Sequence, residues 1–320
     1  MSRRIATPQT ISREVACSRV LLRVATVQPA TERRYRAAFE AFLQWAGRRF
    51  SRHLSAVDMD SLLSQYIHHL RDHGVGRSWA VNATYGLLLY LPHFRHSLHG
   101  SLLDLRGWER LAPSVSYPPL PRSFVMVAAV KLSYTPGYGR RLAFSLILAF
   151  HCYLRCGELL ALTPADVIRP ASSDGQWALS LRRTKTGPNQ WVMIEDERIG
   201  VVLGRLRGRT AWGCRLFPFA AATLRAALRW ALSAIGVSGD FTLHSLRHGG
   251  ATHDFLSGVS IEDILHRGRW RSNNSARRYI QAARAALVVT DTPSIVQRNE
   301  RRVLAEWHVN FTDFTPSHRR

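Results

Sequence analysis

The chain has 320 residues, of which 46% are hydrophobic and 21% charged, so it can bury a sizeable core and wholesale disorder is excluded. Lysine and arginine together number 44 against 22 acidic residues, a formal net charge of +22. Such a surplus favours a polyanionic partner, DNA or RNA, although a solvated basic surface or an arginine-rich genome would give the same composition.

Two further classes are disfavoured before any motif is considered. The longest apolar run, residues 142–150, is too short to span a membrane. The four cysteines form no CxxC pair and no regular framework, which is typical of a protein from a reducing compartment. We therefore expect neither a transmembrane helix nor a disulfide scaffold.

The N-terminal third predicts an arm followed by a helical bundle. Residues 1–27 carry arginine and serine with a single acidic side chain, and we expect a DNA-touching arm or a transit peptide there. Over residues 28–111, Thr31 is positioned to cap a first helix and Ser55 to cap a second. A third helix is expected over residues 78–91.

A proline cluster then divides the chain. The cluster contains Pro113, Pro118, Pro119 and Pro121. Proline interrupts helices and stiffens extended backbone, so residues 112–122 predict a linker between two domains.

The second domain, expected over residues 123–290, mixes helices with one hairpin. An apolar helix is predicted over 140–154 and a short one over 158–162. Residues 177–183 and 191–194 alternate like strands and flank a turn that places Lys185 near its tip. Later helices are expected at 196–207, 222–235, 246–257, 260–267 and 275–287. Residues 291–320 are expected to form a basic tail, with room for one more helix.

Several side chains of this second domain have the chemistry needed to break a phosphodiester. His244 and Arg247 stand three residues apart, on one face of a helix start. Arg155 follows the apolar helix and offers a second guanidinium. Lys185 is one of only two lysines, and unlike arginine a lysine can release a proton near neutral pH. Tyr279, the last tyrosine of the chain, offers a nucleophile that would need a nearby base or cations.

The order and spacing of these residues resemble those of the tyrosine recombinases, or phage-type integrases. The family's series of Arg, hairpin Lys, His-x-x-Arg, His or Trp, and Tyr is matched by Arg155, Lys185, His244, Arg247, Trp270 and Tyr279. Trp270 follows Arg247 by 23 residues and Tyr279 follows Trp270 by nine, which also fits the family. The resemblance is close over residues 140–285 and looser over 28–110.

The resemblance implies a role for each residue. Arg155 and Arg247 would clamp the scissile phosphate, with Glu158 orienting Arg155. His244 would accept or return a proton, and Lys185 would protonate the leaving oxygen. Tyr279 would form a 3′-phosphotyrosine bond. Trp270 departs from the commoner His and can donate a hydrogen bond but cannot shuttle a proton. Each residue also has a structural alternative: a surface arginine, a solvated turn lysine, a capping histidine, a core tryptophan or a helix aromatic.

The resemblance further implies a fold and partners. We expect a mainly α chain with a small antiparallel hairpin or three-stranded sheet, in which a helical DNA-binding bundle and a mixed α/β catalytic domain form a C-shaped clamp. The partner would be double-stranded DNA, bound by four protomers on two sites and by a monomer or weak oligomer when free. No metal, ATP or other cofactor is implied, and the setting would be intracellular: a nucleus, or bacterial cytoplasm and nucleoid. A mobile-element origin is a family-level expectation.

Two alternatives to a recombinase stay open from the sequence. A type IB topoisomerase-like enzyme shares the same chemistry. A DNA-binding protein derived from a recombinase would have lost the cutting step, although all six catalytic positions carry competent residues.

Overall fold

The computed structural model describes residues 23–51, 53–113, 117–172, 176–184, 187–270, 272–277, 279–290 and 292–314. Most of the expected N-terminal arm, and Lys185 in the expected hairpin turn, lie outside these residues. The chain divides into two compact units, Met1–Val115 and Ser116–Arg320. Among the described helices, none has the length and apolar character to cross a membrane.

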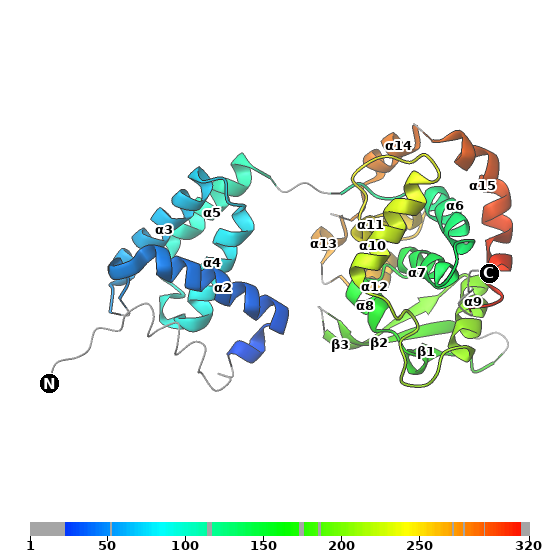
Figure 1. The fold of residues 1–320 in the computed structure, drawn as a ribbon, viewed down its shortest axis with the longest axis horizontal. Coiled ribbons are helices and arrows are strands. Elements are labelled where there is room, and N and C mark those ends of the chain that lie inside the picture. Colours follow the sequence, from blue (N-terminus) through cyan, green and yellow to red (C-terminus); the bar gives the residue numbers. More distant parts are fainter. Residues whose placement is uncertain are drawn as a thin grey trace. The chain divides into compact units, whose positions relative to one another are not determined.

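The first unit is a helical bundle (Figure 1). Its helices are α2 (Pro29–Ala46), α3 (Ala56–Asp72), α4 (Arg77–Tyr90) and α5 (His99–Leu111), with single 3₁₀ turns η1 (Val24–Thr26), η2 (Gly47–Arg49) and η3 (Pro92–Phe94). Helix α2 begins at Pro29, two residues before the expected cap Thr31, because proline is well suited to the first helical position. Ser55 caps α3 as expected, its hydroxyl accepting from the amide of Asp58 at 3.1 Å.

Helix α5 was not expected from the sequence. The free backbone amides at its start are hydrogen-bonded by a side chain of another helix. The carboxylate of Asp60 on α3 accepts from the backbone amides of Gly100 at 2.7 Å and Ser101 at 2.9 Å. A carboxylate at a helix N-terminus satisfies free amides and is favoured by the helix dipole. The apolar faces of the four helices close a core of their own, which includes Phe39, Phe42, Leu63, Leu87 and Leu105.

The second unit holds the remaining helices and the sheet. They are α6 (Arg122–Ser133), α7 (Gly139–His151), α8 (Cys156–Ala161), η4 (Pro164–Asp166), β1 (Val167–Ile168), β2 (Trp177–Thr184), β3 (Gly187–Ile194), α9 (Glu197–Gly208), α10 (Ala221–Ser233), α11 (Leu243–Leu256), α12 (Ile261–Gly268), α13 (Asn273–Arg277), α14 (Ala282–Thr290), α15 (Ser294–Glu306) and η5 (Trp307–Phe311). The unit is mainly α with one small antiparallel sheet, as expected from the sequence.

The three strands pair in the order β1-β2-β3, all antiparallel. Trp177 stands opposite Ile194 and Ser180 opposite Trp191, so the two long strands are the expected hairpin. Val192 and Ile194 face the core, whereas Trp191 and Met193 are exposed, the alternation of a sheet buried on one face.

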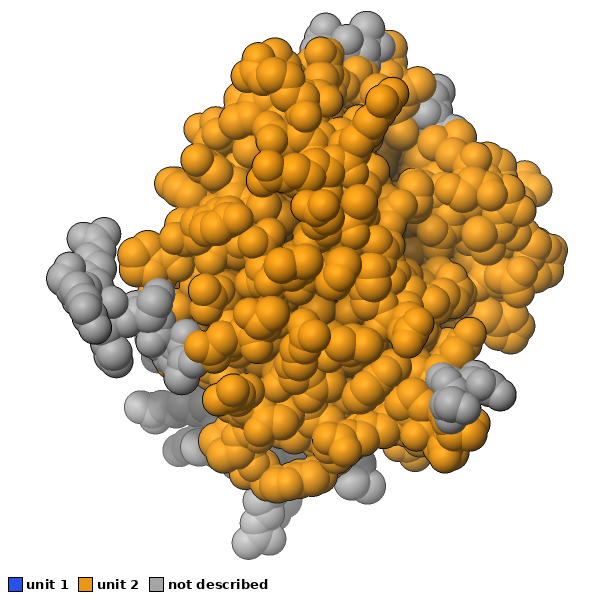
Figure 2. Space-filling model, turned by 90° about the vertical axis from the view of Figure 1, so that its right-hand side faces the viewer, with its two compact units in different colours: residues 1–115 blue, residues 116–320 orange. Residues whose placement is uncertain are grey.

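The C-terminal segment is part of this unit and not a separate tail. Helix α15 lies beside α6 (Figure 1), and Val296, Val303 and Trp307 on one face of the segment are buried. Phe311 and Phe314 continue the contact, each with its ring 5.9 Å from that of Phe144. The arginines that suggested a basic tail over residues 291–320 are exposed on the opposite face. Figure 2 looks onto the side of the unit that carries α15 in Figure 1, and residues 116–320 make up this face.

Candidate active site

The first arginine is placed by a sharp turn after α7. Tyr153 adopts a left-handed backbone conformation with φ 46°, which costs a bulky residue roughly 1–3 kcal/mol and is maintained by the surrounding structure. Arg155 follows as the N-cap of α8. Its backbone amide donates to Oε2 of Glu158 at 2.9 Å and its Nη1 to Oε1 at 2.6 Å, so one carboxylate holds both the backbone and the guanidinium.

Helix α11 supplies the histidine and the second arginine. Its start is fixed by Thr242, whose hydroxyl accepts from the amide of His244 at 3.2 Å. Gly250 lets α11 lie directly on the end of α7, because a Cβ at this position would overlap the carbonyl oxygen of Phe150. This close approach carries Arg247 to the turn after α7, while His244 in the first helical turn is exposed.

The guanidinium of Arg247 is buried and fixed by backbone carbonyls. Nη1 donates to the carbonyl of Tyr153 and Nη2 to that of Gly268. Its Cζ lies 4.5 Å from the ring centre of Trp270 and 5.3 Å from that of Tyr279. Burial, together with the charges of two neighbouring arginines, lowers the pKa of Arg247 to about 9. The group is therefore still protonated at neutral pH, in surroundings that would favour a bound anion.

The end of α12 places Trp270 beside this arginine. Gly268 allows the close packing, since a Cβ there would overlap the Trp270 ring. The indole stacks on Tyr153 with ring centres 5.9 Å apart and lies 4.7 Å from the ring of Tyr279. Its Nε1 is buried and has no hydrogen-bond partner within the described ranges. A buried N–H without a partner is an unsatisfied donor.

Tyr279 lies between α13 and α14, where the sequence pattern predicts one continuous helix over 275–287. The turn is held by the Tyr279 carbonyl, which accepts from Oγ1 of Thr252 at 3.1 Å. On the other side, the ring of His248 stacks on that of Tyr279, with centres 4.5 Å apart and planes at 22°. Oη of Tyr279 lies 3.1 Å from Nε2 of His244. The phenol is thus held between aromatic rings with its oxygen beside an imidazole.

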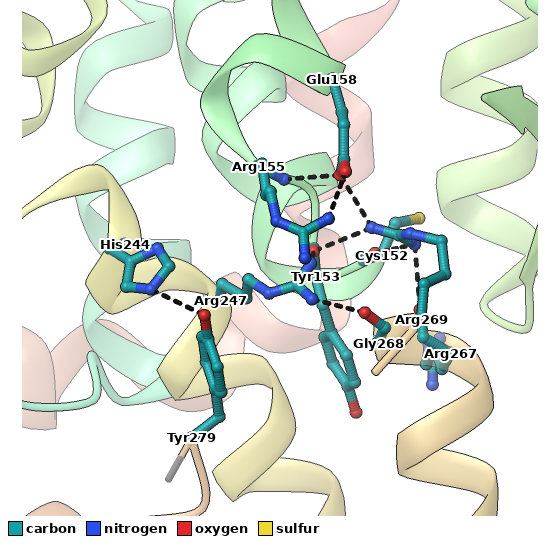
Figure 3. Close-up of polar contacts among 10 residues, drawn as sticks. All are labelled: Cys152, Tyr153, Arg155, Glu158, His244, Arg247, Arg267, Gly268, Arg269 and Tyr279. Carbon is teal, nitrogen blue, oxygen red and sulfur yellow. Dashed lines mark hydrogen bonds and ion pairs between the residues drawn. The ribbon is translucent and has the colours of Figure 1, made fainter. Parts of the chain in front are cut away.

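The structure therefore brings together the side chains that the sequence singled out, except for one outside the described residues. Arg155 and Glu158 come from the start of α8, His244 and Arg247 from α11, and Tyr279 from the segment after α13 (Figure 3). Trp270 follows the end of α12. Lys185 is the side chain outside the described part of the chain.

Two residues of the cluster were missed by sequence reasoning. His248 is not among the candidate residues of the sequence, although its i,i+4 spacing from His244 places both on one helix face. Arg269 gives no local signal, because its partners are distant in the chain. Its guanidinium donates to Glu158 at 2.9 Å and to the carbonyl of Tyr153 at 3.2 Å.

Glu158 lies at the centre of this charge network. Burial alone would raise the pKa of its carboxyl group, but the charge of Arg269 and the hydrogen bonds from Arg155 outweigh burial and hold the pKa below its ordinary value. Glu158 is thus a carboxylate at neutral pH. The cluster offers a phenol next to an imidazole and, around them, fixed guanidinium groups, which suits attack on an anionic substrate such as a phosphodiester.

Comparison with known proteins shows which solved structures share this fold. A scan of protein-family models and a search of curated protein sequences each give no match. Solved structures do match: the Tn1549 transposon integrase in complex with circular intermediate DNA has a TM-score of 0.59 and 13% identity, covering 88% of this chain and 99% of that one. A lambda integrase dimer bound to a COC′ core site has a TM-score of 0.58 and 15% identity, covering 86% and 96%.

A third solved structure is the XerH site-specific recombinase bound to a palindromic difH substrate, with a TM-score of 0.56 and 14% identity, covering 81% of this chain and 78% of that one. These structural neighbours are tyrosine recombinases and integrases, so the chain has the fold that the sequence resemblance implied.

Proposed function

We propose that the chain is a site-specific DNA recombinase or integrase, which cuts and rejoins DNA through a 3′-phosphotyrosine intermediate on Tyr279. The observation that carries the proposal is the position of Tyr279: its Oη lies 3.1 Å from Nε2 of His244, and its ring centre lies 5.3 Å from Cζ of the buried Arg247. A nucleophile, a base and a fixed cation thus meet in one cluster, on a fold shared with structures of DNA-bound recombinases.

The phosphate would be held by donors that are already in place. Arg155 and Arg247 would donate to its nonbridging oxygens, and the unpartnered Nε1 of Trp270 would add a third donor. Fixed donors stabilise the charge that develops on these oxygens in the transition state without reorganising at that moment.

Cleavage would require two proton transfers, one from the nucleophile and one to the leaving oxygen. Oη of Tyr279 attacks phosphorus while its proton passes to His244, and the bond from phosphorus to the 5′ oxygen breaks. The leaving oxygen takes a proton from Lys185, a role proposed from the family resemblance. The phosphotyrosine conserves the bond energy, so the reverse attack by a 5′ hydroxyl rejoins the strand without ATP.

The remaining parts of the proposal concern DNA and assembly. Residues 28–111 would bind duplex DNA beside the catalytic unit, and four protomers on two sites would exchange strands. The net charge of +22 predicts that affinity falls steeply with salt, because phosphate contacts release counterions. The protein would act where its DNA lies, in a nucleus or nucleoid, and a mobile element is its proposed origin.

The test is to capture a covalent adduct. The protein is incubated with a pool of duplexes whose sequence is randomised around a nick, so that the short leaving fragment diffuses away after cleavage. Wild type should form an SDS-resistant adduct that retains a label on the 5′ end of the cut strand, and sequencing the captured DNA gives the target. Tyr279→Phe should form none.

The outcomes separate the alternatives. An adduct that persists in Tyr279→Phe would refute the assignment of the nucleophile. A salt-dependent mobility shift without any adduct would identify a silent DNA-binding protein. Relaxation of supercoiled plasmid that lacks the captured target, at low protein concentration, would identify a topoisomerase-like enzyme. Lys185→Ala should regain cleavage on a strand with a 5′-thiol leaving group, which needs no proton, and absence of rescue would contradict the role of Lys185.

A further inference from the structure

We propose that Arg269 is a positioning residue, which keeps the guanidinium of Arg155 aligned and electrically available for the scissile phosphate through the carboxylate that they share. The inference rests on the proposed function, because it assigns a second arginine to the same phosphate site. It adds a residue that the order of catalytic motifs does not include.

The carboxylate of Glu158 is divided between the two arginines (Figure 3). Oε1 accepts from Nη1 of Arg155 at 2.6 Å, and Oε2 accepts from Nη2 of Arg269 at 2.9 Å. Oε2 also accepts from the backbone amide of Arg155 at 2.9 Å. Arg269 therefore sets the orientation of the carboxylate plane, and that plane sets the direction of the Arg155 side chain.

The two arginines differ in access to solvent. The side chain of Arg269 is 3% exposed and that of Arg155 is 22% exposed. Arg269 is further immobilised by three backbone carbonyls, those of Arg267 at 3.0 Å, Tyr153 at 3.2 Å and Cys152 at 3.4 Å. Arg269 is thus enclosed by protein groups, whereas Arg155 has an open side toward a substrate.

The charges support the same division of roles. Glu158 alone would neutralise Arg155 and reduce its attraction for a phosphate. With Arg269 on the second oxygen, the three groups carry a net charge of +1, so one positive charge is left for the substrate. Paired guanidinium groups also keep a buried carboxylate ionised, which it must be to hold Arg155.

The backbone at Arg269 makes a clean test possible. This residue has φ 54° and caps the end of α12 in the left-handed conformation, which glycine adopts most readily. Substitution by glycine therefore removes the guanidinium and suits the backbone at the same time. Asparagine also tolerates this conformation, and its side chain is too short to replace the guanidinium contact with Glu158.

The experiment measures the single-turnover rate of adduct formation on the DNA captured by wild type. Two substrates are compared, one with the natural scissile phosphate and one with a methylphosphonate, in which a methyl group replaces one charged nonbridging oxygen. Arg269→Gly should slow the phosphate substrate by up to about a hundredfold, the lower end of the range for outright removal of an aligned donor to developing charge. On the methylphosphonate the deficit should shrink, because less charge remains for Arg155 to stabilise.

A double mutant tests whether Arg269 acts through Arg155. Arg155→Ala/Arg269→Gly should be no slower than Arg155→Ala alone, since the second change has nothing left to position. Arg269→Lys, which keeps the charge without the planar fork, should recover part of the rate. Arg198→Gln is a matched control: it also removes an arginine paired with a carboxylate and with backbone carbonyls, in a place without contact to Glu158. Its rate should equal that of wild type.

The outcomes are decisive in both directions. A wild-type rate in Arg269→Gly, or an equal loss on both substrates, would overturn the positioning role. If Arg269→Gly melts at a lower temperature than wild type, Arg269→Asn replaces it in the same comparison. Failure of wild type itself to form an adduct would instead refute the proposed function, and the inference with it.

Discussion

Nε2 of His244 lies 3.1 Å from Oη of Tyr279, and their rings meet edge to face with centres 5.1 Å apart. The two residues come from different elements, the first turn of α11 and the segment between α13 and α14. A distance of this size allows direct proton transfer to a neutral imidazole. The proposed function gives the proton to His244, whose nitrogen lies next to the phenol oxygen; the indole of Trp270, which also lies against the phenol ring, has no basic nitrogen.

His244→Gln should slow adduct formation by about a hundredfold to ten-thousandfold, because glutamine keeps a hydrogen bond but cannot accept the proton. Single-turnover rates on the captured DNA, measured for wild type and the variant, provide the comparison. An unchanged rate in His244→Gln would show that another group takes the proton.

Trp270→Phe should lower the rate by about a hundredfold to a thousandfold, the range for one lost donor to the transition state. Phenylalanine keeps an aromatic ring over Arg247 and removes the buried N–H, which has no partner among the described residues. Trp270→His restores an N–H and should be faster than the phenylalanine variant. Adduct rates for the three proteins, at equal melting temperature, make the comparison. Equal rates for Trp270→Phe and wild type would leave the indole with a packing role alone.

The candidate site was predictable where its signals are local. A His and an Arg three residues apart can be recognised within one helical turn, and both lie on α11, which begins at Leu243, three residues before the expected start of the helix. The hairpin was predictable for the same reason, since alternation and turn residues are short-range features. Helix α11 carries both Arg247 and His244.

Other parts depend on partners far away in the chain. At the start of helix α5, the backbone amides donate hydrogen bonds to the carboxylate of Asp60 on α3, which lies about forty residues earlier in the chain. Arg269 meets Glu158 across 111 residues, so nothing near Arg269 distinguishes it from the many other arginines. The break between α13 and α14 is held by Thr252 from α11, and without that contact the helical periodicity predicts one helix through Tyr279.

His248→Ala should reduce the adduct rate by about threefold to tenfold, because an aromatic pair contributes roughly 0.5–1.5 kcal/mol beyond area burial and here it holds the phenol in place. His248→Phe keeps a stacking ring and should lie between alanine and wild type. Adduct rates are measured together with DNA affinity, which should not change. A rate for the alanine variant equal to wild type would show that the other contacts of Tyr279 suffice.

His151→Gln should make the folded protein less sensitive to acid. Nε2 of His151 lies 3.0 Å from Nη2 of Arg267, which donates to it, so the imidazole is neutral. Burial, followed by the charge of Arg267, lowers the pKa of His151 from 6.5 to about 3. Below pH 6.5 the unfolded chain therefore binds a proton that the folded chain does not. Stability then falls by up to about 1.4 kcal/mol per pH unit until the pH approaches 3.

Glutamine can accept the same hydrogen bond and does not titrate. The free energy of unfolding of the variant should therefore fall less steeply as the pH is lowered. Urea unfolding at intervals between pH 7 and pH 4 measures it. His253, whose pKa burial also lowers, contributes equally to both proteins, and the difference between them isolates His151. Parallel curves for the two proteins would mean that His151 is protonated in the folded state. In that case Arg267 could not donate to the ring of His151, because a protonated imidazole has no acceptor nitrogen.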